Sequence, residues 1–162
     1  MKPENMLKGR MAESLVEELL KQCDNKVYRF GYEAILQDLT QLEKAFDREG
    51  EVGQRISSIP DFIVVNQKKI LFVEVKFRTD LTVYLEDIRR MDLVEKFWKA
   101  KIILLTTQQP YFRVSNSPYL NKEQEWNWIP LKEDPDFEIS DDILKQFNEL
   151  VEKYYIAGKN KK

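Results

Sequence analysis

The sequence predicts an α/β fold in which helices flank a mixed sheet of four to five strands. Two neighbouring runs rich in β-branched and aromatic residues, 59–65 and 69–78, are typical of a hairpin. A helical period and then a buried strand follow them, which favours a parallel neighbouring strand. At 162 residues the chain suits one domain, expected over residues 1–158, with 159–162 as a frayed basic tail.

The first element is a predicted helix over residues 7–23. Its apolar residues fall on one stripe at helical spacing: Ala12, Leu15, Val16, Leu19, Leu20 and Cys23. Glu13 lies at the edge of that stripe, so its carboxylate is the one most able to point along the packed face towards the hairpin. An ordinary solvated glutamate on a surface helix is the alternative.

Between this helix and the hairpin the pattern is weaker. Residues 26–32 alternate like a first strand, and residues 33–49 carry a moderate helical pattern. Residues 50–58, which contain two glycines, are predicted to form a loop. Arg55 in this loop is a candidate phosphate contact or simply an exposed arginine.

The hairpin register brings two carboxylates together. A tight turn between the runs pairs Val65 with Ile70, and the same register puts Asp61 opposite Glu74, with Cβ atoms roughly 5 Å apart. Lys76 follows on the same face because side chains alternate along a strand. The intervening apolar residues of the second run form the opposite, buried face.

Opposed carboxylates repel each other unless a cation lies between them. Oxygen ligands suit Mg2+, which keeps several waters for a substrate or nucleophile. Lys76 would then orient a bound water or neutralise charge on a phosphate. A solvated sheet face with a weak Glu74–Lys76 ion pair is the alternative, although both residues interrupt a dense apolar run on a strand that looks central.

The second half of the chain contributes further elements. Residues 84–98 form a predicted amphipathic helix and 101–107 a buried strand. Residues 110–128 are irregular and rich in aromatics, which either stack on unpaired bases or close the end of a core. Residues 126–131 are a predicted edge strand, and Ser140 is the predicted N-cap of a closing helix.

Composition excludes several classes of chemistry. The chain has no histidine, which rules out Ser-His-Asp and Cys-His catalysis and argues against a structural zinc site. Cys23 is the single cysteine, so no intrachain disulfide forms. Neither a signal peptide nor an apolar run of membrane-spanning length is present, so we expect a cytoplasmic protein without membrane contact.

Charge is unevenly distributed along the chain. The formal net charge is -2, which is not typical of a nucleic-acid-binding protein. Residues 66–101 nevertheless hold nine lysines and arginines against six acids, whereas residues 123–142 hold eight acids and one lysine. A local basic surface can steer a phosphate backbone even when the whole protein is acidic.

These residues also carry a family resemblance. Pro60-Asp61, a spacing of twelve residues, and then Glu74-Val75-Lys76, with the helical Glu13 upstream, resemble the signature of the PD-(D/E)xK nuclease superfamily. The Holliday-junction-resolvase-like branch is the most similar. The resemblance implies a restriction-endonuclease-like core in the order αβββαβ, to which the closing helix would be an addition.

The resemblance implies a Mg2+-dependent deoxyribonuclease, with Mn2+ as an alternative metal. Asp61, Glu74 and the backbone carbonyl of Val75 would bind the metal, and Glu13 would complete the site directly or through a water. Lys76 would orient and help to activate the attacking water. Relatives often place a further polar residue on the following helix, and here Tyr84 and Arg90 are the candidates.

The expected partner is DNA, including branched or single-stranded DNA, and a homodimer is expected by analogy with many relatives. Arg55, Arg78 and Arg90 are the candidate DNA contacts. A non-catalytic nucleic-acid-associated module that keeps the nuclease fold is the alternative function. An unrelated α/β fold with a coincidental motif is a third hypothesis, and it predicts that Asp61 and Glu74 lie far apart.

Overall fold

A computed structural model describes residues 3–31, 49–67, 69–82 and 84–157. Its six-stranded sheet follows the order of the sequence from one edge to the other. The strands are β1 (Lys26–Arg29), β2 (Phe62–Val65), β3 (Ile70–Arg78), β4 (Lys101–Thr106), β5 (Phe112–Ser115) and β6 (Ile129–Pro130). Only the β3–β4 pair is parallel among these strands, so the predicted mixed sheet is confirmed, but it has six strands rather than four to five.

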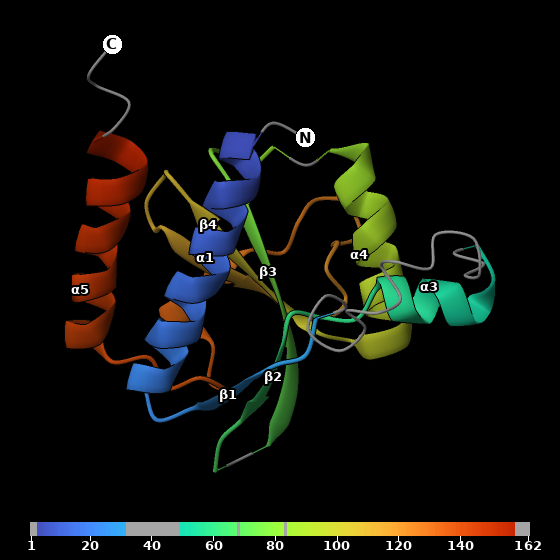
Figure 1. The fold of residues 1–162 in the computed structure, drawn as a ribbon, viewed down its shortest axis with the longest axis horizontal. Coiled ribbons are helices and arrows are strands. Elements are labelled where there is room, and N and C mark those ends of the chain that lie inside the picture. The colour runs from blue at the N-terminus through green and yellow to red at the C-terminus, as the bar shows by residue number, and fades with distance from the viewer. Residues whose placement is uncertain (1–2, 32–48, 68, 83, 158–162) are drawn as a thin grey trace.

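Helices cover both faces of the sheet (Figure 1). They are α1 (Pro3–Gln22), α3 (Glu51–Ser57), α4 (Leu85–Trp98) and α5 (Asp141–Val151), with short helical turns η2 (Leu131–Glu133) and η3 (Glu152–Ile156). The main core joins α1 and α5 to one face of β3 through Val73 and Val75. On the other face, Met91 of α4 packs against Ile102 of β4. No described helix is long and apolar enough to span a membrane.

The hairpin register agrees with the sequence prediction. Val65 pairs with Ile70, and the ladder runs to the pair Phe62–Val73. One further step in this register leads from Asp61 to Glu74. Because side chains alternate along β3, Glu74 lies on the face opposite Val73; it is fully buried and paired with Arg90 of α4.

The predicted crossover is also confirmed. From β3 the chain passes through α4 and returns as β4, which pairs with β3 in parallel along its whole length. Lys99 ends α4 in the left-handed conformation at φ 47°, and its N–H caps the carbonyls of Val94 and Glu95. Every residue of β4 is buried, as its apolar run indicates.

Residues 50–58 were predicted to form a loop, and this prediction is wrong. Gly50 is the N-cap of helix α3. Glu51 and Arg55 form an i,i+4 ion pair at 3.4 Å, and Ser58 Oγ donates to the Gln54 carbonyl at 2.7 Å. These local contacts support one short helix despite two glycines. The predicted strand over 26–32 ends at Arg29, and the predicted helix over 33–49 falls, apart from residue 49, outside the described residues.

The segment 110–128 is more ordered than predicted, because residues 112–115 pair with β4 as strand β5. Its aromatics close the core: Phe112 lies in the main core, and Trp126 and Trp128 pack against the smaller cluster. The predicted edge strand is reduced to Ile129–Pro130. Helix α5 begins after Ser140 as predicted, without a side-chain cap from that serine, and the tail 159–162 lies outside the described residues.

A buried lysine connects the start of β4 to the segment that follows η2. Lys101 begins β4, and its Nζ lies 2.7 Å from Asp134 Oδ2, 2.8 Å from Asp136 Oδ2 and 2.6 Å from Asn116 Oδ1. Asp134 is almost fully buried. The network ties the segment that follows η2 to the first residue of β4, which keeps charged residues paired where water is excluded.

Candidate metal and nucleic-acid site

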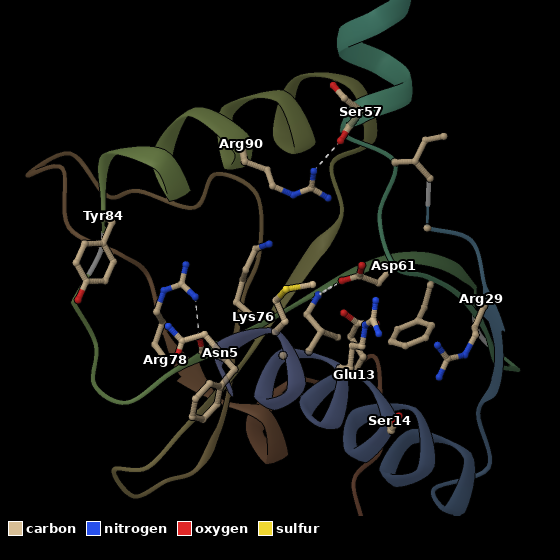
Figure 2. A pocket seen from close by; sticks show the side chains of 18 of the residues that line it. Asn5, Glu13, Ser14, Arg29, Ser57, Asp61, Lys76, Arg78, Tyr84 and Arg90 are labelled. Atoms are coloured by element: carbon tan, nitrogen blue, oxygen red, sulfur yellow. Dashed lines mark hydrogen bonds between the residues drawn. The ribbon is translucent and has the colours of Figure 1, made fainter. Parts of the chain in front are cut away.

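A cleft of about 1110 Å3 opens between α1, the second half of β3 and α4 (Figure 2). Its charged lining residues are Arg10, Glu13, Arg29, Asp61, Lys76, Arg78 and Arg90. Five of these seven side chains are cationic, although the whole chain carries a net charge of -2. The cleft is therefore a basic surface on an acidic protein, which suits an anionic polymer.

Asp61 is fixed by bonds to two neighbouring strands. Its Oδ2 accepts a hydrogen bond from the Val75 N–H of β3 at 2.7 Å. Its backbone carbonyl accepts from the N–H groups of Phe30 and Gly31, at 2.8 and 3.1 Å, just beyond β1. The carboxylate is thus held at the end of β2, where it lines the cleft (Figure 2).

Glu74 lies behind the cleft lining with none of its surface exposed. Its Oε1 lies 2.8 Å from both Lys76 Nζ and Arg90 Nε, and its Oε2 accepts a longer bond of 3.4 Å from Arg90 Nη2. A buried carboxylate without such partners would be strongly destabilising. Burial favours a higher pKa for Glu74, but Lys76 and Arg90 outweigh it and lower the pKa, so Glu74 is ionised.

Asp61 behaves differently from Glu74. Burial raises the pKa of Asp61 to about 8, and the charge of Glu74 adds to that rise. Lys76 and the Val75 N–H oppose the rise, while Glu13 adds slightly to it. The strand register, together with the hydrogen bond from Val75 to Asp61, brings Asp61 next to Glu74, and this contradicts the hypothesis of a coincidental motif with distant acids.

The donor set fits a hard divalent cation that keeps several of its water ligands. Proteins commonly hold Mg2+ through one or two carboxylates and leave the other positions to water. Asp61, which accepts a hydrogen bond from the Val75 N–H, and Glu74, the residue before Val75, supply two such carboxylates. Within the described residues, no three acidic or cysteine side chains are grouped to hold one ion, so direct coordination by Glu13 together with both acids finds no support.

Glu13 reaches the cleft because it lies at the edge of the buried apolar stripe of α1, as its helical position predicts. The apolar stripe of α1 is fully buried at Ala12, Val16 and Leu19. Glu13 stands at the edge of that stripe and lines the cleft on the α1 side (Figure 2). From there it contributes negative charge near Asp61, which is compatible with a role through an intervening water.

The three arginines predicted to contact DNA take different places. Arg90 of α4 lies in the cleft, paired with Glu74, and its Nη1 donates to the Ser57 carbonyl at 2.6 Å. Arg78 also lines the cleft, in an ion pair with Asp87. Arg55 is not among the cleft-lining residues; it is 61% exposed and stacks over the Phe97 ring.

Two cleft arginines were missed from the sequence. Arg10 precedes Glu13 by three residues, so it shares the same face of α1, and helical spacing alone was enough to find it. Arg29 at the end of β1 carries no comparable signal. It enters the cleft through tertiary contacts, an ion pair with Glu17 at 2.7 Å and a position over the Phe62 ring.

Comparison with known proteins leaves the family open. No family model matches the chain, and no curated protein matches it. Among solved structures, the chain is similar to Hjc, a Holliday junction resolvase from Archaeoglobus fulgidus, with 18% sequence identity and a TM-score of 0.43. The match covers 85% of this chain and 98% of the resolvase chain. A likeness this low does not assign a function, which must come from the residues of the cleft.

Proposed function

We propose that the protein is a metal-dependent nuclease that hydrolyses phosphodiester bonds in DNA. One observation carries the proposal: Asp61 and Glu74 meet at the junction of β2 and β3, and the Lys76 ammonium lies 2.8 Å from Glu74 beside a basic cleft. Two acids and a lysine in this arrangement suit hydrolysis by a metal-activated water, and they need neither histidine nor a covalent intermediate.

In this proposal the acids hold the metal and the cations handle the substrate. Asp61 and Glu74 would bind Mg2+ or Mn2+ together with the Val75 carbonyl, and Glu13 would act through a water. When bound, the metal would supply Lewis-acid stabilisation of the phosphate and a more acidic water. Lys76, 23% exposed and lining the cleft, is placed to orient that water and to neutralise charge on the phosphate.

The remaining cations of the cleft would hold the DNA backbone. Arg10 of α1 lines the cleft. Arg29 at the end of β1 and Arg78 at the end of β3 also line it and lie on opposite sides of Asp61 in Figure 2. A phosphodiester chain that crosses the cleft would pass between these groups and over Lys76. Such contacts give affinity that falls as salt concentration rises.

A second function is favoured by the ion pairs of Glu74. Lys76 and Arg90 already neutralise this carboxylate, so Glu74 needs no metal ion to compensate its charge. A non-catalytic DNA-binding module would use the same basic cleft and would need no metal. The two functions therefore differ in whether a divalent cation is required, and binding of DNA in the presence of a chelator is expected of both.

The test is a cleavage assay on duplex, branched and single-stranded DNA with Mg2+, with Mn2+ and with a chelator. We expect metal-dependent cleavage by the wild type and none by Lys76→Ala or Asp61→Asn. Lys153→Ala, an exposed lysine of η3, is the matched control and should cleave normally. Cleavage that survives Lys76→Ala would overturn the mechanism, and DNA binding without cleavage under any metal would favour the non-catalytic module.

A further inference from the structure

Arg90 is held more firmly than any other cation that reaches Glu74. Its Nε and Nη2 donate to the two oxygens of Glu74 at 2.8 and 3.4 Å, and its Nη1 donates to the Ser57 carbonyl at 2.6 Å. These acceptors belong to different elements, β3 and α3. Figure 2 shows the side chain reaching down from α4 towards Lys76 and Asp61.

This anchoring separates Arg90 from Lys76. Lys76 holds Glu74 through a single contact and ends in an ammonium group, so it can turn towards a phosphate without breaking a second bond. Arg90 would have to release Glu74 and Ser57 together. Its planar guanidinium also places its donors at fixed angles, which favours retention of both contacts.

A fixed guanidinium on Glu74 has a direct consequence for cation binding. A carboxylate with a cation already bound attracts a second cation less strongly, because the two positive charges repel each other. Glu74 is fully buried, so water screens this repulsion poorly. Part of the negative charge that a divalent ion would find at the Asp61–Glu74 pair is therefore already neutralised.

We propose that Arg90 is a built-in cation that weakens divalent-metal binding at the Asp61–Glu74 pair while it holds the Glu74 carboxylate in place. This inference rests on the proposed function in one respect: it takes those two acids as the metal ligands. It assigns Arg90 a positioning role through Glu74, which agrees with the polar residue expected on this helix beside the metal and differs from the DNA contact also expected from the sequence. The protein is then an intrinsically weak metal binder whose affinity Arg90 sets.

The test compares metal affinity among variants of one helix. Arg90→Gln removes the charge but keeps amide donors for Glu74 and Ser57. Arg89→Gln is the matched control, since Arg89 is the exposed neighbour on α4 and its loss changes the net charge equally. Mn2+ binding is measured by electron paramagnetic resonance and Mg2+ binding by calorimetry, without DNA, and thermal melting confirms that each variant folds.

We expect Arg90→Gln to bind Mn2+ about tenfold or more tightly than the wild type, because the variant removes a positive charge that repels the metal ion at Glu74. Arg89→Gln should change affinity far less. Arg90→Lys keeps the charge but cannot span both Glu74 and Ser57, so its Mn2+ affinity should lie between those of the wild type and Arg90→Gln. This variant replaces Arg90→Gln in the test if the glutamine variant does not fold.

Equal affinity in wild type, Arg90→Gln and Arg90→Lys would overturn the inference, and so would absence of binding in all of them. The outcome is independent of the cleavage assay. Tighter Mn2+ binding in Arg90→Gln without any cleavage would leave the inference standing and remove the nuclease proposal. Cleavage by the wild type, together with unchanged metal affinity in Arg90→Gln and Arg90→Lys, would support the nuclease proposal and overturn the inference about Arg90.

Discussion

Asp61 Oδ2 lies 2.7 Å from the Val75 backbone nitrogen, so a side chain continues the pairing of β2 and β3 one step past the last backbone pair, Phe62–Val73. The same carboxylate faces the cleft and feels the charge of Glu74. Asp61 thus has two roles that favour different side chains. At the strand junction the side chain only has to accept a hydrogen bond, which asparagine can also do. The negative charge of the aspartate, by contrast, stabilises the folded protein only beside a cation.

The first prediction separates these roles. Asp61→Asn keeps an oxygen acceptor for Val75 and removes the repulsion with Glu74, so its free energy of unfolding in chelator should equal or exceed that of the wild type. Asp61→Ala leaves the Val75 N–H without its acceptor and should lose about 1–3 kcal/mol. Urea unfolding monitored by circular dichroism measures both. If the asparagine variant is as unstable as the alanine variant, the acceptor role is wrong.

The second prediction concerns the buried pair Lys101–Asp134. Asp134→Ala removes a fully buried acceptor of the Lys101 ammonium and should lower the free energy of unfolding by about 1–3 kcal/mol for each buried donor that is left unsatisfied. Asp141→Ala is the control, because Asp141 also pairs with a lysine, Lys132, but both side chains are exposed. That variant should change stability by less than about 1 kcal/mol.

The two aspartate variants are compared by chemical unfolding in the same buffer. A loss in Asp134→Ala as small as that in Asp141→Ala would mean that water or Asp136 replaces the missing partner of Lys101. A loss is expected because Asp134 is buried and accepts hydrogen bonds not only from Lys101 but also from Asn116 Nδ2 at 3.2 Å and the Asp136 N–H at 2.8 Å, so its removal leaves several donors without an acceptor.

The third prediction is a dependence of stability on pH. Burial alone would raise the pKa of Asp136, but hydrogen bonds and charges from Lys101 and Lys69 lower it overall. The folded-state pKa therefore lies below the unfolded value of about 3.9. Asp136 stabilises the folded protein above the unfolded pKa, and that stabilisation is lost as the pH falls through the folded pKa.

Asp136→Asn removes this titration. On acidification from about pH 5 to about pH 3, the wild type should therefore lose more stability than the variant. Melting temperatures across this range in one buffer system measure the difference. Parallel curves for the two proteins would show that Asp136 keeps an ordinary pKa in the folded state.

Sequence patterns were sufficient where one local period dominates. The alternation along β3 and the short polar stretch between the two apolar runs predict the register, and the register alone brings Asp61 to Glu74. The stripe of α1 likewise puts Glu13 at the cleft. Such features follow from repeated geometry over several residues, which single exceptions do not disturb.

Sequence patterns failed where tertiary contacts decide. Two glycines concealed α3, whose helical turns are supported by a local ion pair and serine contacts. Strand β5 depends on β4 as a partner, which no local pattern shows. Arg90 looked like a DNA contact because it lies on the polar side of a helix; its partners Glu74 and Ser57 come from 16 and 33 residues away.

The fourth prediction concerns an exposed aromatic at the cleft. Tyr84 lines the cleft, is 56% exposed, and has the Arg78 guanidinium 5.9 Å from its ring centre. Exposed aromatics beside cations stack on unpaired bases, and each such contact contributes about 1–3 kcal/mol. Tyr84→Ala should therefore weaken binding of single-stranded or branched DNA by about tenfold.

Tyr154 is a matched control for Tyr84. It is 53% exposed and has the Lys153 ammonium 5.1 Å from its ring centre, but it lies on η3 and is not among the cleft-lining residues. Fluorescence anisotropy in chelator at one fixed salt concentration gives the affinities. Tyr84→Phe and Tyr154→Ala should bind like the wild type, because stacking needs a ring at the cleft and no hydroxyl. An equal loss in Tyr84→Ala and Tyr154→Ala would show that DNA does not use this cleft.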